Sequence, residues 1–179
     1  MGRDDRRMIT FSELEASAPD VAEPIRDRLT TTGLALLGTI RADGSPRVSP
    51  IEVTLHDGHL YVGMMPGSRK SLDVLRDPRI SLLTPVADKD DLAGEGKLFG
   101  ELRTVEDLDQ IAAVFHAAVD DSDYEVSDLE GSPVFEVLVS GAAWQRVEDQ
   151  TFVTGSWDPV HGVRLRHRVG ATGEVEDVA

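Results

Sequence analysis

The chain has 179 residues, which is enough for one domain of ordinary size with a real hydrophobic core. Its formal net charge is −15, with 33 acidic against 18 basic side chains and no basic stripe, so the composition argues against binding to DNA or RNA. The chain has no cysteine, which excludes disulfides and thiolate chemistry, and no apolar run approaches the roughly 20 residues that cross a bilayer.

The segment that opens the chain carries cations without an apolar stretch behind them. Met1–Arg7 therefore lacks the pattern of a secretory signal. Together with the absence of cysteine, this predicts a cytoplasmic protein with no membrane partner.

The first predicted elements are helical. Thr10–Glu13 reads as a capping box, and an amphipathic helical segment follows to about Leu29, with breaks expected at Pro19 and Pro24. From Gly33 the pattern changes to short apolar runs separated by tight turns. The strands predicted in this part are Leu34–Ile40, Pro46–Val53, His59–Met64, Arg79–Thr84 and Lys97–Leu102.

Two further helices and a second group of strands complete the prediction. A short helix covers Ser68–Arg76, and another is capped by Thr104 and buries the face that carries Leu108 and Ile111. The last third is β again, with strands at Val134–Val139, Ala142–Val147, Thr151–Trp157 and Gly162–His167. Short strands with turns about every 8–12 residues predict a mainly β fold, a barrel with helices packed outside it.

The most informative motif lies in the middle of the chain, where Gly67–Ser71 opens the short helix and Asp77–Leu83 closes it. A Gly-Ser turn at a helix start leaves backbone N–H groups free, and the helix dipole favours an anion there. The adjacent cations Arg69 and Lys70, with the two Ser hydroxyls, complete a cradle for one phosphate. The alternative is a capped surface helix in which Arg69 pairs with Asp73 at i,i+4.

Three segments in order resemble the pyridoxamine 5'-phosphate oxidase-like family of FMN-binding split barrels. They are Leu36–Ile51, His59–Met64 and Gly67–Leu83. The resemblance covers about residues 30–105 well and the C-terminal third loosely. It implies a split β-barrel, mainly β, with helices packed outside the barrel.

The resemblance also implies a domain organisation. Residues 1–179 form a single FMN-binding split-barrel domain. An N-terminal helical segment, 1–32, precedes the flavin-binding half, 33–103, and the helix 104–118 leads to C-terminal strands over 132–168.

Carried over residue by residue, the resemblance assigns most of the cofactor site to two places. The flavin phosphate would be held by Ser68, Arg69 and Lys70. The strand beneath the isoalloxazine, whose backbone groups would bond the ring edge, corresponds to Arg47, Val48, Ser49, Pro50 and Ile51. A Pro inside a strand argues for an edge or a bulge, and bulges often mark sites.

Two further places complete the predicted site. The strand end beside the ring and ribityl chain corresponds to Gly63, Met64 and Met65, although methionines more commonly fill a core. Trp157 corresponds to the family's C-terminal Trp, which closes over flavin and substrate, and Trp144 is the other match. The cations after Trp157, at Arg164–Arg168, are spaced differently from the family signature.

The function implied by the resemblance is a flavin-dependent oxidoreductase that acts on an unidentified small organic substrate. The flavin would lie between the subunits of a homodimer. Ser49 and Thr54 stand where pyridoxamine 5'-phosphate oxidase, the best-known member of the family, has basic residues. This difference argues against pyridoxamine phosphate as the substrate. Hydride chemistry belongs to the flavin, so no catalytic side chain is assigned, and the five His residues predict no metal site.

Two alternatives stay open at this point. One is a deazaflavin-dependent reductase of the same superfamily, whose cofactor has a longer acidic tail and favours extra cations near Arg69 and Lys70. The other is a non-catalytic flavin- or haem-binding module, with His116 or His161 as the axial ligand.

Overall fold

The computed structural model describes residues 7–86, 93–119, 131–149, 151–169 and 174–178, so almost all of the segment that carried the prediction of cellular location lies outside it. The helices are α1 Phe11–Ser17, α2 Pro19–Thr32, α3 Arg69–Arg76 and α4 Leu108–Ala118. The strands are β1 Leu34–Ile40, β2 Pro46–His56, β3 His59–Gly63, β4 Arg79–Leu83, β5 Glu95–Thr104, β6 Val134–Glu148, β7 Thr151–Asp158, β8 Gly162–Val169 and β9 Glu174–Val178. None of the described helices combines the length and hydropathy that a bilayer crossing needs.

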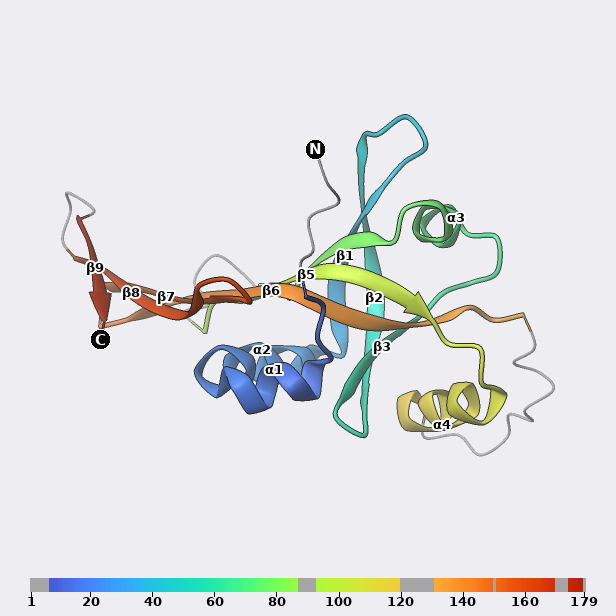
Figure 1. The fold of residues 1–179 in the computed structure, drawn as a ribbon, viewed down its shortest axis with the longest axis horizontal. Coiled ribbons are helices and arrows are strands. Elements are labelled where there is room, and N and C mark those ends of the chain that lie inside the picture. The colour runs from blue at the N-terminus through green and yellow to red at the C-terminus, as the bar shows by residue number, and fades with distance from the viewer. Residues whose placement is uncertain (1–6, 87–92, 120–130, 150, 170–173, 179) are drawn as a thin grey trace.

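Six of the strands close into an antiparallel barrel (Figure 1). Their order is β3-β2-β1-β4-β5-β6, and β6 pairs back onto β3 through Val62 and Phe135. Side chains alternate between the two faces of each strand, so that Leu37, Leu82 and Leu98 meet inside the barrel. The predicted mainly β split barrel with external helices is confirmed.

Strand β6 is a single strand of 15 residues where the sequence predicts two. Phe99 of β5 pairs with Gly141 and Gly100 pairs with Val139, so Ser140 is an extra residue in β6 and forms a bulge. The strands approach closely here, because a Cβ on Gly100 would lie 1.8 Å from the Leu138 carbonyl oxygen. The bulge bends β6 without ending it, and its second half carries β7, β8 and β9 outward as a sheet extension (Figure 1).

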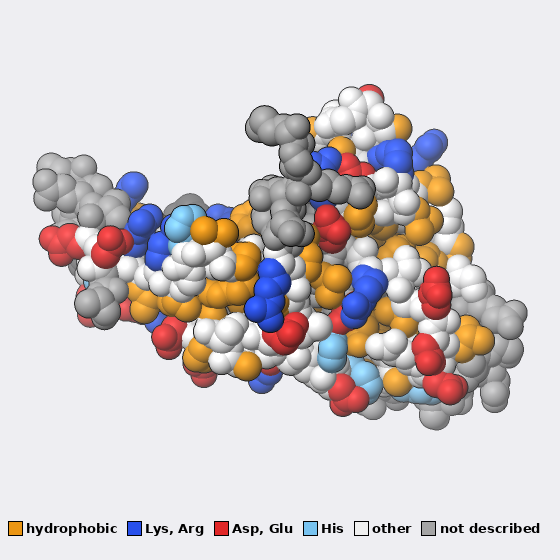
Figure 2. Space-filling view, viewed as in Figure 1, with side chains coloured by type: hydrophobic (Ala, Val, Ile, Leu, Met, Phe, Trp, Pro, Cys, Tyr) orange, Lys and Arg blue, Asp and Glu red, His pale blue; other side chains and the backbone are white. Residues whose placement is uncertain are grey.

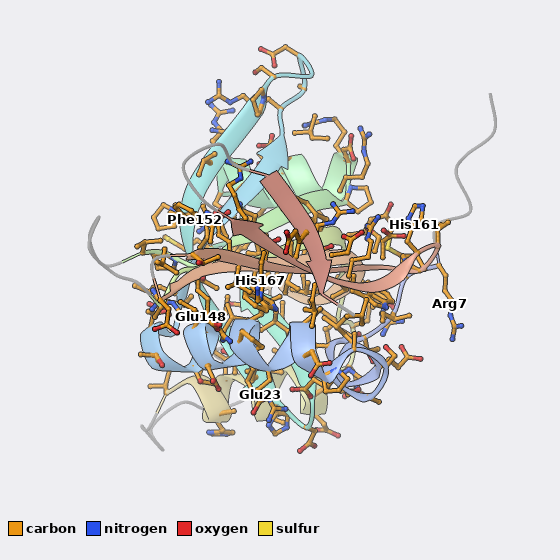
Figure 3. All side chains as sticks on the ribbon, turned by 90° about the vertical axis from the view of Figure 1, so that its left-hand side faces the viewer. Arg7, Glu23, Glu148, Phe152, His161 and His167 are labelled. Atoms are coloured by element: carbon orange, nitrogen blue, oxygen red, sulfur yellow. The ribbon has the colours of Figure 1, made fainter. Side chains whose placement is uncertain are left out.

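The inner face of the barrel continues as one face of this extension. Leu98, Ala142 and Trp157 are paired in register across β5, β6 and β7, and all three are buried. Helices α1 and α2 lie against this face, and none of the described helices covers the opposite face of the extension (Figures 1 and 3). One apolar core therefore serves both the barrel and the extension.

Helix α2 contains Pro24 where the sequence predicts a break. The break occurs only at Ala18, before Pro19. Pro24 has no N–H to give to the Asp20 carbonyl one turn earlier. The indole Nε1 of Trp144 donates to that carbonyl instead, at 2.9 Å. The tertiary structure thus replaces the lost helical hydrogen bond and fixes Trp144 as an anchor of α2.

Two further differences from the sequence prediction concern element ends. Helix α4 is capped by Asp107, whose carboxylate accepts the N–H groups of Asp109 and Gln110, rather than by Thr104. Thr104 is still part of β5, because its pairing with β6 extends that far. Strand β9 is not predicted, since its acidic sequence lacks an apolar alternation, and it forms by pairing with β8.

A buried carboxylate lies at the seam where the barrel closes. Glu136 of β6 is opposite Tyr61 of β3, and its side chain is 4% exposed. Its Oε1 lies 2.6 Å from His59 Nδ1, and its Oε2 accepts from Arg103. This pairing compensates the burial of the charge.

The Asp20–Trp144 hydrogen bond leads to a test by double substitution. Trp144→Phe should lower the free energy of unfolding by about 1–3 kcal/mol, since it leaves a carbonyl without a donor. In a Pro24→Ala background the helix can supply its own donor, so the same substitution should cost less. Urea unfolding of the four proteins measures the coupling. Equal losses in the two backgrounds would contradict this account of Trp144.

Candidate functional site

The free edge of β2 is the first feature of the candidate site. Its second half, Val53–His56, pairs with β3, whereas the first half, Pro46–Glu52, pairs with β1 alone. One edge of this first half therefore has no strand partner among the described residues. Helix α3 comes close to it, and the Lys70 ammonium donates a hydrogen bond to the Pro50 carbonyl at 2.9 Å.

A tight turn leads into α3. The Ser68 N–H donates to the Met65 carbonyl at 3.1 Å, with Pro66 next and Gly67 at φ +68°, the requirements of a type II turn. The Ser68 hydroxyl then caps the helix by accepting the Ser71 N–H at 3.3 Å. The first helical hydrogen bond is from the Leu72 N–H to the Ser68 carbonyl, so the N–H groups of Arg69 and Lys70 are left at the helix end without a helical partner.

The two adjacent cations of this turn have different surroundings. Arg69 is exposed and forms no ion pair with any described residue. The predicted alternative, an Arg69–Asp73 pair, does not form. Lys70 is half-buried against β2, and burial lowers its pKa. The turn therefore presents one free guanidinium and one ammonium fixed at the edge of β2.

Asp73 takes part in a polar cluster beneath this turn that the sequence interpretation missed. Its carboxylate accepts from Thr39 Oγ1 at 3.0 Å and from Arg47 Nε at 2.6 Å, and Arg76 lies 3.4 Å away. Burial alone would raise the pKa of Asp73, but the hydrogen bonds from Arg47 and Thr39 and the charge of Arg47 outweigh it and hold the pKa below its usual value. Only folding brings these residues together.

The predicted residues of β2 divide between its two faces. Val48 and Pro50 point outward and are exposed. The other three face the barrel interior or its α3-covered end, since each pairs with a buried residue of β1; they are Arg47, Ser49 and Ile51. A ligand on the outer face would meet this strand through its backbone and through the side chains of Val48 and Pro50.

The residues at the end of β3, before the turn, also differ in their exposure. Gly63 is exposed at the end of β3. Met64 is buried in the core at 6% exposure, which is the alternative that its residue type suggests, whereas Met65 is 78% exposed beside the turn. The structure thus brings Met65, Ser68, Arg69, Lys70 and the free edge of β2 into one region.

Trp157 lies in a different part of the structure from α3 and the free edge of β2. It is buried on the helix-covered face of β7 and lines a cleft of about 350 Å³ with Ile9 and Ala16 of the α1 region. Neither α3 nor the free edge of β2 contributes to this cleft. The cluster around Arg69 and the predicted Trp157 are therefore separate within one chain.

A second cleft, of about 300 Å³, lies between α2 and the sheet extension. Figure 3 shows His167 and Glu148 on the α2 side of the strands, with Phe152 on the other side. The Arg146 guanidinium covers the Trp144 ring at 4.6 Å and bonds to Glu148. Trp144, the second match for the family's closing Trp, lines this cleft, whereas Trp157 and the predicted residues of β2, β3 and α3 do not.

The remaining cations near α3 are bound by neighbouring groups. Arg76 donates to the Ile40 carbonyl and lies beside Asp73. Arg79 donates from Nε and from its terminal nitrogen to the Asp77 carboxylate, at 2.9 and 2.6 Å. On the face in Figure 2, basic side chains are interspersed with acidic ones.

His116 and His161 are the two histidines that the haem alternative would use as axial ligands. His161 lies in the β7–β8 turn with Nδ1 at 2.9 Å from Asp158, and His116 is exposed near the end of α4. Neither belongs to the cluster around α3. Among the described residues, no three His, Cys, Asp or Glu side chains are arranged to hold a metal ion.

A comparison with family models decides the relationship of the chain. The model of the family described as Pyridoxamine 5'-phosphate oxidase matches residues 21–144, more than half of the chain. The protein belongs to this family. The matched segment of this pyridoxamine 5'-phosphate oxidase family member runs from α2 to the middle of β6 and includes the β2 edge and α3. No curated protein sequence matches the chain.

Solved structures with the same fold include three useful examples. Campylobacter jejuni ChuZ superposes with a TM-score of 0.62 at 13% identity, covering 85% of this chain and 63% of that one. A heme binding protein from Mycobacterium smegmatis gives 0.57 at 19%, covering 87% and 85%. A NimC/NimA family protein from Clostridium acetobutylicum gives 0.55 at 16%, covering 87% and 97%. At these identities, the likeness is one of fold.

The lowered pKa of Asp73 predicts a pH-dependent contribution to stability. Its folded-state pKa lies below its ordinary value of 3.8, so the ionised carboxylate stabilises the fold above that pH, and the effect is lost as the pH falls through the folded pKa. Asp73→Asn should therefore lower the free energy of unfolding by about 1.5–3 kcal/mol at neutral pH. Urea titrations from about pH 7 to pH 3 should show the difference from wild type shrinking at the acid end. A difference that stayed constant across this range would contradict the assignment.

Proposed function

We propose that this member of the pyridoxamine 5'-phosphate oxidase family is an FMN-dependent oxidoreductase acting on a small organic substrate. The observation that carries the proposal is the position of the α3 turn beside the free edge of β2, joined by the Lys70–Pro50 hydrogen bond. A helix start can bind the phosphate of a phosphorylated flavin, and a strand edge with unpaired backbone groups can bind the edge of its ring.

The charges around α3 favour a cofactor with one phosphate. Arg47 and Arg76 are occupied by Asp73, and Arg79 is occupied by Asp77. Of the arginines in α3 and its two flanking turns, Arg69 has no acidic partner among the described residues, and Lys70 lies beside it. A deazaflavin cofactor with a long acidic tail would call for additional unpaired cations here. We therefore favour FMN over the deazaflavin alternative.

The chain's own groups divide the work of binding. The Arg69 guanidinium and the outward N–H groups of the α3 turn would hold the phosphate, with the Ser68 side chain fixing the turn. The free edge of β2 would offer backbone groups to the ring edge, and Lys70 lies at that edge. The bound flavin would supply the two-electron chemistry.

We propose a homodimer with the cofactor at the interface. Val48, Gly38, Ser81 and Phe99 form one row across the outer face of β2, β1, β4 and β5. Val48 and Phe99 are 67% and 45% exposed although apolar, and exposed apolar surface often marks an interface. The small side chains between them leave the face flat enough to accept a second copy.

The cations of the segment Arg164–Arg168 do not support pyridoxamine phosphate as the substrate. Arg164 donates to Asp158 at 2.7 Å and Arg166 donates to Asp177 at 2.8 Å, so of these three arginines only Arg168 has no acidic partner among the described residues. A substrate phosphate needs convergent cations that are free to bind it. The substrate is therefore proposed only as a small organic molecule. Trp157 is left out of the proposed site because it is buried on the helix-covered face.

The phosphate cradle is tested by removing its cations. Arg69→Ala with Lys70→Ala should weaken FMN binding by several kcal/mol, at about 1.5–3 kcal/mol for each charge-assisted hydrogen bond. Titration of the apoprotein with FMN, followed by flavin fluorescence and absorption, measures the affinity.

Arg79→Ala is the matched control, because it removes a cation at the other end of α3 that is already paired with Asp77. It should leave FMN affinity nearly unchanged. An FMN affinity equal to that of wild type in the folded double variant would overturn the assignment. Preferential binding of deazaflavin by the wild type would favour the other cofactor.

The interface is tested on the outer sheet face. Phe99→Glu places a charge on this face and should shift sedimentation from dimer to monomer and weaken FMN binding by about tenfold or more. Val160→Glu, in the exposed β7–β8 turn, is the control and should change neither. A wild-type monomer that binds one FMN tightly would rule out the dimer site.

A further inference from the structure

We propose that Asp73 is the positioning residue of the phosphate cradle: its carboxylate holds the first turns of α3 at the free edge of β2. The proposal rests on the FMN site proposed above. It assigns to Asp73 no contact with the cofactor, only control of where Arg69 and Lys70 stand.

The carboxylate joins the three elements that form the site. It accepts from Thr39 of β1 and from Arg47 of β2, while Asp73 itself belongs to α3. Arg76, one turn further along α3, reaches both Asp73 and the Ile40 carbonyl at the end of β1. A single buried side chain therefore fixes the helix against two strands at once.

Helix α3 has little else to hold it. It is eight residues long, and helices this short are marginal without tertiary contacts. Of its apolar side chains, Val74 is buried, whereas Leu72 and Leu75 are 47% and 61% exposed. Apolar packing is thus confined to one face, and the polar contacts of Asp73, Lys70 and Arg76 set the position of the helix against β1 and β2.

The same contact has a second effect on the site. The Arg47 guanidinium is directed to Asp73 rather than to the α3 turn. The carboxylate therefore restricts Arg47 to a structural role and leaves phosphate recognition to the turn. Arg47, assigned to the cofactor site by resemblance, then acts through Asp73.

The experiment compares FMN with riboflavin, which lacks the phosphate. The ratio of the two dissociation constants, riboflavin over FMN, isolates the contribution of the cradle from that of the ring site. Asp73→Asn should lower this ratio by about tenfold or more, the loss that one charge-assisted hydrogen bond represents. Riboflavin affinity itself should change much less.

Glu136→Gln is the matched control. Glu136 is also a buried carboxylate between two basic partners, with a side chain 4% exposed against 6% for Asp73, but it lies at the β3–β6 seam. This variant should lose stability and keep the wild-type ratio. A ratio that fell equally in both variants would mean that loss of stability alone weakens the cradle, which overturns the positioning role.

A second variant keeps the test valid if Asp73→Asn does not fold. Thr39→Val removes the neutral donor to the same carboxylate with little change of shape, and should lower the ratio in the same direction by less. An unchanged ratio in a folded Asp73→Asn protein, or in Thr39→Val where only that variant folds, overturns the proposal and leaves the cradle standing.

A measurement without flavin separates this proposal from the proposed function. Amide hydrogen exchange of the apoprotein should be faster in α3 of Asp73→Asn than in α3 of Glu136→Gln at equal global stability. If the wild type bound neither flavin, or bound both equally, the FMN site would be wrong. The exchange result would still decide the role of Asp73, and unchanged protection of α3 would overturn it.

Discussion

The pairing of β6 with two different partners is the constraint on which the rest of the structure depends. Its first half closes the barrel on β3, and its second half begins the sheet extension by pairing with β7. The bulge at Ser140 lets one continuous strand do both. Since the inner face of the barrel runs on into the extension, α1 and α2 can cover it as one core, and none of the described helices covers the opposite face of the extension.

The candidate site follows from where this closure leaves backbone unpaired. Strand β3 lies between β2 and β6 and is only five residues long, so the first half of β2 keeps an edge without a strand partner among the described residues. Helix α3 lies beside that edge, and the Lys70–Pro50 hydrogen bond satisfies one of its carbonyls. The Asp73 carboxylate forms ion pairs with Arg47 and Arg76. These internal ion pairs, rather than the number of basic residues, therefore decide which cations are free to bind an anionic ligand.

Much of the fold could be predicted because it rests on local patterns. Strand β1 and the α3 segment with its Ser68 cap were placed within a residue, since alternation and turn chemistry are written in neighbouring residues. The continuous strand β6 was missed because a bulge depends on the partner strand. The continuation of α2 through Pro24 is not predicted, because the compensating donor, Trp144, is 120 residues away in the chain. No local pattern reveals such a contact.

By itself, the sequence determined the class of fold, the turn and cap that start α3, and the two adjacent cations there. These depend on residues a few positions apart, whose backbone preferences act before any tertiary contact forms. Only the tertiary structure decided which cations are free, that Met64 is core while Met65 is exposed, and that Trp157 lies apart from the cradle. Charge pairing and burial depend on which distant segments meet, as Asp73 shows by taking Arg47 and Thr39 instead of its helical neighbour Arg69.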